Sequence, residues 1–225
     1  MGVVARGRGQ EGQRVSNRQP SWRGWDGWGG WVDGLFERER RRLNQWLVDT
    51  LARQIRLPVG SRVLECGSGT GFGSSVFAAR TGVHLSVAVD LDLTALRHAH
   101  RRDLMLPAVA ANAYRLPFSA SLFDLVWNSS TLEHLSEPGR ALEEMSRVTK
   151  PAGYVFVGVP YRFGPLGCQP WISHTALGEW IGPVFDRRRF AQMMMRNGLI
   201  PESSFTYFYR CFIGILARKT CCITE

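Results

Sequence analysis

Residues 63–74 read Val-Leu-Glu-Cys-Gly-Ser-Gly-Thr-Gly-Phe-Gly-Ser, and this stretch decides the fold. The residues up to Cys66 have the character of a short buried strand, and those from Ser74 to Arg80 suit a helix. Between the two, glycine stands at every second position: Gly67, Gly69, Gly71 and Gly73. Glycine allows positive φ or close approach to a ligand, and a helix that begins directly afterwards presents free N–H groups to it. The stretch therefore predicts a strand–turn–helix unit that binds a nucleotide-type cofactor.

The spacing of the glycines separates two kinds of cofactor site. A dinucleotide fingerprint requires Gly-x-Gly-x-x-Gly, but Phe72 stands at the sixth position counted from Gly67. The chain instead has an acidic residue, one further residue and then Gly-x-Gly-x-Gly. This pattern resembles the first motif of class I S-adenosylmethionine (SAM)-dependent methyltransferases. The resemblance implies that SAM is the cofactor and that it is bound by Glu65, Gly67, Ser68, Gly69 and Gly71.

A second buried strand, residues 84–90, ends in Asp90. In an open α/β sheet, a carboxylate at this place accepts hydrogen bonds from the ribose hydroxyls of the cofactor. The resemblance adds the next residue, Leu91, to the cofactor site. The alternative for Asp90 is an N-cap of the helix that begins near Leu93, although Asp92 fits that cap better.

Residues 112–118 read Asn-Ala-Tyr-Arg-Leu-Pro-Phe and follow a third strand expected at 106–111. Methyltransferases of the small-molecule type commonly show Asp-Ala-x-x-Leu-Pro-Phe here, and the acid accepts a hydrogen bond from the adenine amino group. The resemblance gives that role to Asn112 and places Ala113 at the same site. The amide oxygen of Asn112 can still accept this hydrogen bond.

Residues 121–128 predict the fourth strand and match the family's Phe-Asp-x-Val signature at 123–126, which adds Asn128 to the implied cofactor site. Doubly wound sheets bind ligands just beyond the carboxyl ends of their strands. Glu133 and His134 follow this end, and a histidine of near-neutral pKa can remove a proton from an attacking hydroxyl or amine. His174, in an irregular stretch at 161–183, is a second candidate base. The alternative is a structural role for the Glu133–His134 pair.

The order of elements predicts an α/β fold. The resemblance makes it a Rossmann-like three-layer α/β/α sandwich, with a mostly parallel seven-stranded sheet and a C-terminal antiparallel hairpin. A turn at 147–153 resembles the family's Arg-Val-Leu-Lys-Pro-Gly-Gly, with Ala152 replacing one glycine, and leads into a fifth strand at 154–160. A helix at 186–197 and strands at 202–209 and 211–217 complete the pattern.

Composition divides the chain into three parts. Residues 1–20 are expected to be a disordered basic tail, 21–60 a tryptophan-rich segment and a helix, and 61–225 the methyltransferase domain. The tryptophans at 22, 25, 28 and 31 either pack on the domain surface or form a lid over the site. The helix is expected at 32–56, where apolar residues form one stripe.

Charge and cysteine content bear on partners and location. The net charge is +9, and nearly all basic residues are arginine; much of the excess lies in Arg6, Arg8, Arg14, Arg18 and Arg23 and in Arg38 and Arg40–Arg42. A polyanionic partner such as nucleic acid is therefore possible but not favoured. Five scattered cysteines show no zinc spacing, no metal site is expected, and the start of the chain lacks the apolar stretch of a signal peptide. With no apolar run near the roughly 20 residues of a membrane span, a reduced cytoplasmic protein is expected.

The sequence thus favours SAM-dependent methyl transfer to an O-, N- or C-nucleophile on a small-molecule or lipid-like acceptor. The segment after Asn128 lacks the Asn/Asp-Pro-Pro-Tyr and Pro-Cys motifs of DNA methyltransferases. Three alternatives stay open: an RNA or protein methyltransferase that uses the basic tail, a nicotinamide dehydrogenase, and a methyltransferase-like binding protein without turnover. Phe72 and the absence of a Tyr-x-x-x-Lys pair disfavour the dehydrogenase.

Overall fold

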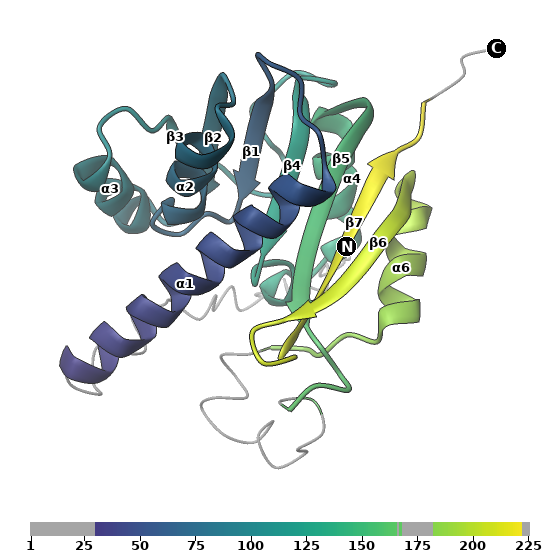
Figure 1. The fold of residues 1–225 in the computed structure, drawn as a ribbon. Helices are drawn as coiled ribbons and strands as arrows, with labels where there is room; N and C mark the ends of the chain where they lie inside the picture. Colours follow the sequence, from purple (N-terminus) through teal and green to yellow (C-terminus); the bar gives the residue numbers. More distant parts are fainter. Residues whose placement is uncertain (1–29, 166, 168–181, 222–225) are drawn as a thin grey trace, which may run out of the picture.

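The computed structural model describes residues 30–165, 167 and 182–221. Seven strands form one sheet in the order β3-β2-β1-β4-β5-β7-β6 (Figure 1). The strands are β1 (Arg62–Cys66), β2 (Leu85–Asp90), β3 (Ala108–Ala110), β4 (Phe123–Ser129), β5 (Thr149–Pro160), β6 (Leu199–Tyr207) and β7 (Phe212–Lys219). The helices are α1 (Gly30–Gln54), α2 (Phe72–Thr81), α3 (Leu93–Arg102), α4 (Pro138–Val148), α6 (Arg187–Arg196) and the short 3₁₀ helix η2 (Leu132–His134).

The sheet is mostly parallel. The pairs β1–β2, β1–β4, β2–β3 and β4–β5 are parallel, whereas β7 runs antiparallel to both β5 and β6. The strand order reverses between β1 and β4, so the carboxyl ends of these two strands form the edge where open α/β sheets bind ligands. The predicted α/β architecture and its terminal hairpin are confirmed.

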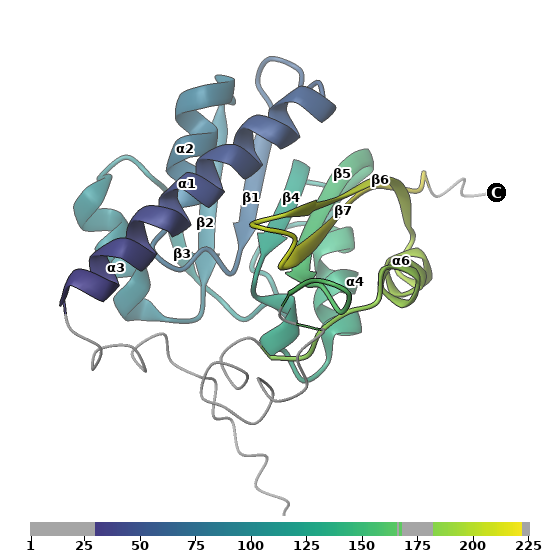
Figure 2. The same cartoon turned by 60° about the horizontal axis from the view of Figure 1, so that its bottom comes forward.

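Helices cover both faces of the sheet (Figures 1 and 2). Successive residues of β4 point to opposite faces, so Leu125 and Trp127 pack with α1 and α2, and Val126 packs with α4 and α6. The helix expected at 32–56 is α1, whose residues Leu47 and Leu51 are fully buried against the sheet. No helix in the described part of the chain is long and apolar enough to cross a membrane.

Several predicted boundaries were wrong. The fifth strand begins at Thr149 rather than 154, so the family-like turn lies inside β5, where Ala152 has a φ of 58°. The third strand is confined to Ala108–Ala110. The terminal hairpin has strands displaced from the expected ranges, and Phe208–Arg210 between them all have positive φ although none is glycine.

The expected basic tail at 1–20 and most of the tryptophan-rich segment lie outside the described residues, and so does His174.

Candidate cofactor and acceptor site

The loop from Gly67 to Gly71 joins β1 to α2 at the edge where the strand order reverses. The N–H groups of Gly67 and Ser68 both donate to the carbonyl of Val89, at 2.8 and 2.9 Å, so the loop is fixed to the end of β2. Gly67 and Gly71 have φ values of 77° and 63°, a region that favours glycine. The predicted strand–turn–helix unit is therefore present.

Protein packing explains most of the glycines in this loop. A Cβ on Gly67 would collide with the side chain of Thr131, and one on Gly71 would lie 2.8 Å from Leu106 Cδ2. Gly73 is already in α2, where a Cβ would lie 2.5 Å from the indole of Trp127. Glycine at these three positions therefore lets the side chains of Thr131, Leu106 and Trp127 pack against the loop and the start of α2.

Glu65 holds the start of α2. Its Oε2 accepts hydrogen bonds from the backbone N–H and the hydroxyl of Ser74, each at 2.6 Å. Ser74 is the third residue of α2, and Glu65 is buried. Its carboxylate therefore satisfies one of the free N–H groups of the helix start, as a capping side chain does, from a neighbouring strand. The sequence predicted Glu65 as a cofactor ligand, and within the protein this oxygen fixes the loop.

The carboxylate of Asp90 faces the glycine loop. Its Oδ2 accepts from the N–H of Gly69 at 2.7 Å, and its Oδ1 accepts from the N–H of Asp92 at 2.9 Å. Asp92 caps α3 through bonds from the N–H groups of Thr94 and Ala95. The prediction that Asp92 is the cap is confirmed. Leu91, between the two acids, is 49% exposed.

Asn112 lies in a tight turn beside the end of β2. The N–H of Ala111 donates to the carbonyl of Asp90, and Asn112 Oδ1 accepts from the N–H of Tyr114 at 2.9 Å. This bond assigns the amide orientation, because the oxygen must face the N–H. The amide NH₂ has no partner among the described residues, so Asn112 can donate to a ligand, and its oxygen keeps a second lone pair that can accept. The sequence had predicted that the Asn112 oxygen accepts a hydrogen bond from the adenine amino group.

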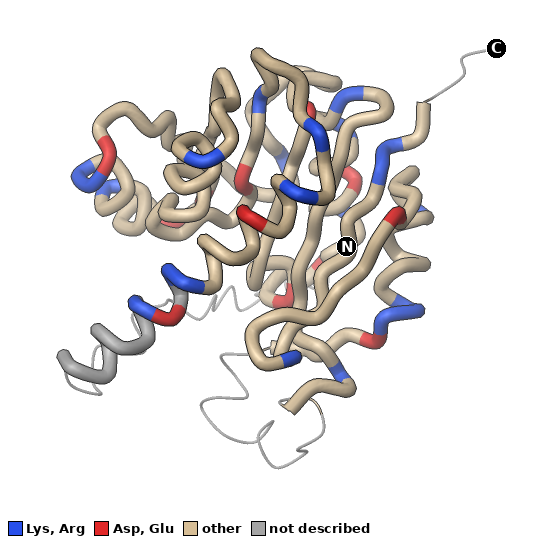
Figure 3. The backbone as a smooth tube through the Cα atoms, in the orientation of Figure 1, with Lys and Arg blue, Asp and Glu red and all other residues tan. Residues whose placement is uncertain are grey.

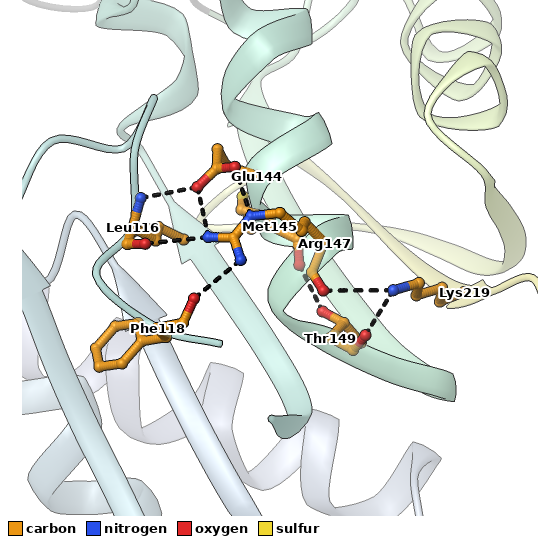
Figure 4. A network of polar contacts seen from close by, with 7 residues as sticks. All are labelled: Leu116, Phe118, Glu144, Met145, Arg147, Thr149 and Lys219. Carbon is orange, nitrogen blue, oxygen red and sulfur yellow. Dashed lines mark hydrogen bonds and ion pairs between the residues drawn. The ribbon is translucent and has the colours of Figure 1, made fainter. Parts of the chain in front are cut away.

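An ion pair at the end of α4 holds the segment that follows Asn112 and Ala113 (Figure 4). The guanidinium of Arg147 donates to the carbonyls of Leu116 and Phe118, at 3.0 and 2.9 Å. The N–H of Leu116 donates to Glu144, which also receives two hydrogen bonds from Arg147. Hydrogen bonding from Arg147 lowers the pKa of Glu144. The pair therefore anchors residues 116–118 by three backbone groups.

Two lysines form contacts at the opposite end of the sheet from the glycine loop. Lys219 Nζ donates to the carbonyl of Thr149 at 2.7 Å (Figure 4), and Lys150 forms an ion pair with Asp124 at 2.7 Å. Both contacts lie where β4 and β5 begin and β7 ends.

Two buried polar atoms at the carboxyl ends of β1 and β4 lack a partner within the described part of the chain, Ser68 Oγ and Asn128 Oδ1. The amide nitrogen of Asn128 donates to the carbonyl of Cys66 at 2.6 Å, which fixes its oxygen. Buried polar atoms are normally hydrogen-bonded, so an unpaired pair of this kind fits a polar ligand. The amide oxygen can accept from the ammonium group of an amino acid, and the serine hydroxyl can donate to its carboxylate. Burial raises the pKa of the Cys66 thiol to about 12, which keeps it protonated.

Glu133 and His134 lie on η2, just past the end of β4. Glu133 is buried, its Oε2 has no partner among the described residues, and burial raises its pKa to about 8. Burial lowers the pKa of His134. A Cβ on Gly182 would lie 3.3 Å from the Glu133 carbonyl oxygen and 3.4 Å from His134 Nδ1, so the returning chain covers this pair.

Sequence reasoning missed two residues at this edge. Thr131 packs on Gly67 and donates to its carbonyl at 3.2 Å, and Tyr207 reaches the end of β4 from β6. Tyr207 could have been sought from the sequence, because Gly158 and Gly214 lie inside two strands. A glycine inside a strand often marks the close approach of another part of the protein.

Comparison with known proteins agrees with this geometry. Residues 64–157 match the family model of the methyltransferase domain. A demethylmenaquinone methyltransferase of Paenarthrobacter aurescens is 37% identical over 125 residues, which cover 56% of this chain and 47% of that protein. The ubiquinone/menaquinone biosynthesis C-methyltransferase UbiE of Bordetella parapertussis is 35% identical over 144 residues, 61% of this chain and 55% of that protein. The matched stretch is thus about half the length of these relatives.

A solved SAM-dependent methyltransferase from Aquifex aeolicus has the same fold, with a TM-score of 0.63 at 18% identity, covering 79% of this chain and 92% of that one.

Proposed function

The chain contains a class I SAM-dependent methyltransferase domain, and from this premise we propose that the protein transfers the methyl group of SAM to a lipid-like, quinone-type small molecule. The quinone class is supported by the two relatives named for demethylmenaquinone and UbiE-type methylation. We further propose that residues 61–225 form the catalytic domain, that 21–60 flank it, that 1–20 are a basic tail, and that the protein is cytoplasmic. Free thiols at Cys66, Cys211 and Cys221 support a reducing compartment.

One observation carries the cofactor proposal. The glycine loop, the Asp90 carboxylate and the unpartnered Ser68 Oγ and Asn128 Oδ1 all lie at the edge where the strand order reverses. Asp90 would accept from the ribose hydroxyls, with Leu91 beside them, and Asn112 and Ala113 would lie at adenine. Ser68 and Asn128 would hold the amino-acid end, along the loop formed by Gly67, Gly69 and Gly71. Glu65 would act indirectly, because it fixes that loop.

For the acceptor, we propose that Glu133 and His134 hold and move protons. The ordinary histidine pKa lies near 6.5, so a lowered pKa keeps His134 neutral and able to accept a proton at neutral pH. Glu133, with a pKa near 8, exchanges a proton in the same range. SAM supplies an activated methyl group, so the protein mainly has to align the acceptor and exclude water. His174 is retained as a second candidate base.

The test is a titration followed by an assay. Calorimetry with SAM, S-adenosylhomocysteine and NAD should give micromolar binding of the first two and none of NAD. Reduced 1,4-naphthoquinone, incubated with SAM, should then gain one methyl group by mass spectrometry. Binding of NAD alone would refute the cofactor, and cofactor binding without transfer to any quinol would favour a binding protein without turnover.

A methyltransferase acting on RNA or protein is the second candidate, because the chain has a net charge of +9. Lys and Arg of the described residues are spread over several elements rather than gathered on one (Figure 3). RNA affinity that falls steeply with salt would favour this candidate, since phosphate contacts release counterions.

A further inference from the structure

Tyr207 crosses the sheet to reach the acceptor side of the site. It lies on β6, yet its hydroxyl is 3.0 Å from Ser129 Oγ on β4, and β7 and β5 lie between these strands. Gly214 on β7 and Gly158 on β5 face each other in register. A Cβ on Gly158 would collide with the Tyr207 hydroxyl, and one on Gly214 would lie 3.4 Å from its ring. The two glycines therefore make the space in which this side chain lies.

The hydroxyl groups of Tyr207 and Ser129 have one donor that the hydrogen bond between them does not use. Tyrosine and serine hydroxyls each have one proton, and only one of the two can lie between the oxygens. Whichever group donates, the other proton has no acceptor among the described residues. Tyr207 is 3% exposed and Ser129 is partly buried, so this unused donor lies largely away from bulk water.

An unpartnered acceptor lies at the same end of the sheet. Glu133 is 5% exposed and its Oε2 has no partner within the described residues. Glu133 lies on η2, four residues after Ser129 and just beyond the end of β4. A buried donor and a buried acceptor at the same end of the sheet match a single hydroxyl group, which both accepts and donates.

Aromatic side chains surround the same end of the sheet. Trp46 stacks on Tyr207 with ring centroids 6.3 Å apart. The turn at 161–164 packs on the hairpin turn, since the N–H of Tyr161 donates to the carbonyl of Cys211 at 2.8 Å. These turns carry Phe163 and Tyr209, which are 58% and 80% exposed. Exposed aromatic residues beside a buried polar group suit a flat apolar ligand with one polar end.

We propose that Tyr207, Ser129 and Glu133 form a subsite that binds a ring hydroxyl of an aromatic acceptor. This deepens the proposed function, on which it rests, by naming the residues that select an aromatic alcohol over a hydrocarbon of the same shape. Tyr207 and Ser129 are specificity residues, and Glu133 is the group that shares the proton of the acceptor.

The experiment compares two probes of similar shape, 1-naphthol and 1-methylnaphthalene, with the full chain. Binding is followed by quenching of tryptophan fluorescence, with and without S-adenosylhomocysteine. The unmodified protein should prefer 1-naphthol by about tenfold, the equivalent of one net hydrogen bond. Tyr207→Phe and Ser129→Ala should each reduce this preference to about twofold or less. Tyr154→Phe is the matched control, because its hydroxyl contacts Arg218 at the opposite edge.

Each outcome decides a different point. Equal binding of the two probes by the unmodified protein, or a preference that survives in both Tyr207→Phe and Ser129→Ala, would overturn the subsite. A loss of preference in the control as well would also overturn it, since the effect would then be general. Absence of S-adenosylhomocysteine binding would refute the proposed function. The probe titrations performed without S-adenosylhomocysteine would still test the subsite.

Discussion

Asp90 and Asp92, two residues apart, have different neighbours and therefore different expected roles. Asp92 caps the N-terminus of α3, whereas Asp90 faces the loop between β1 and α2. A carboxylate oxygen can accept more than one hydrogen bond, so the bonds from Gly69 and Asp92 leave Asp90 able to accept from a ligand. The pair thus offers a matched comparison of a binding role with a capping role.

Asp90→Ala should weaken binding of S-adenosylhomocysteine by about 1.5–3 kcal/mol, the range for hydrogen bonds to a charged group. Asp92→Ala should leave that affinity nearly unchanged and lower the free energy of unfolding by about 0.5–2 kcal/mol, because it removes a helix cap. Calorimetry and urea unfolding of both variants measure the two quantities. Equal effects on affinity would mean that Asp90 acts only through the fold.

Ala152 adopts a backbone conformation that glycine tolerates better, with a φ of 58°. Ala152→Gly should therefore raise the free energy of unfolding by about 1 kcal/mol, the cost of a left-handed conformation for a residue with a Cβ. Ala79→Gly in the last turn of α2 should lower it by up to about the same amount, because glycine is unfavourable within a helix. Urea unfolding of both variants checks the signs, and a destabilised Ala152→Gly protein would contradict the assignment of strain.

At the scale of elements, the Glu144–Arg147 pair connects α4 to the segment that carries the proposed adenine site. One planar guanidinium donates to two carbonyls, of Leu116 and Phe118, and to Glu144. Lysine has the same charge but cannot reproduce this fork. The contact therefore depends on geometry more than on charge.

Arg147→Lys should lower the free energy of unfolding by about 1–3 kcal/mol, because carbonyls of a half-buried segment lose their donor. It should also weaken S-adenosylhomocysteine binding severalfold, since residues 112–118 would lose their anchor. Arg42→Lys is the control: its pair with Glu39 lies on the surface of α1, and such pairs contribute about 0–1 kcal/mol. Titration and unfolding of both proteins test this, and similar losses in the two would refute the anchoring role.

For the whole molecule, Glu133 should make stability depend on pH. Its pKa is about 8 in the folded chain against an ordinary 4.5. Between these values the folded protein holds a proton that the unfolded chain has released, so stability is greatest below the lower value and falls as pH rises towards the upper one. The slope for one proton is up to about 1.4 kcal/mol per pH unit.

Glu133→Gln removes the carboxyl group that titrates. The lowered pKa of His134 makes stability change with pH in the opposite direction, and this contribution is present in both proteins. Relative to the unmodified chain, the variant should gain more than about 1 kcal/mol of unfolding free energy between about pH 5 and about pH 8. Denaturant unfolding at the two pH values measures the change. A difference that stays constant with pH would show that Glu133 ionises normally in the folded protein.

The sequence predicted the sheet better than the site. The glycine loop and the alternation of elements were local signals, and they gave the architecture because right-handed crossovers leave few arrangements. Tyr207 reaches β4 across two intervening strands, which is a long-range contact, so no nearby sequence pattern encoded it. The same limit applies to Asn112, because the hydrogen bond from Tyr114 to its oxygen depends on the turn that these residues form. The positive φ values at Phe208–Arg210 also depend on the strands that the hairpin joins.

The chain has two lysines, Lys150 and Lys219, and both lie at the edge of the sheet opposite the glycine loop. Reagents that attach dyes or surfaces through amines would therefore reach lysine side chains only at that edge, apart from the α-amino group of the chain. A protein tethered through either lysine would present its cofactor loop to the solution. Immobilised binding assays could thus be built on the native chain, without adding a tag near the site.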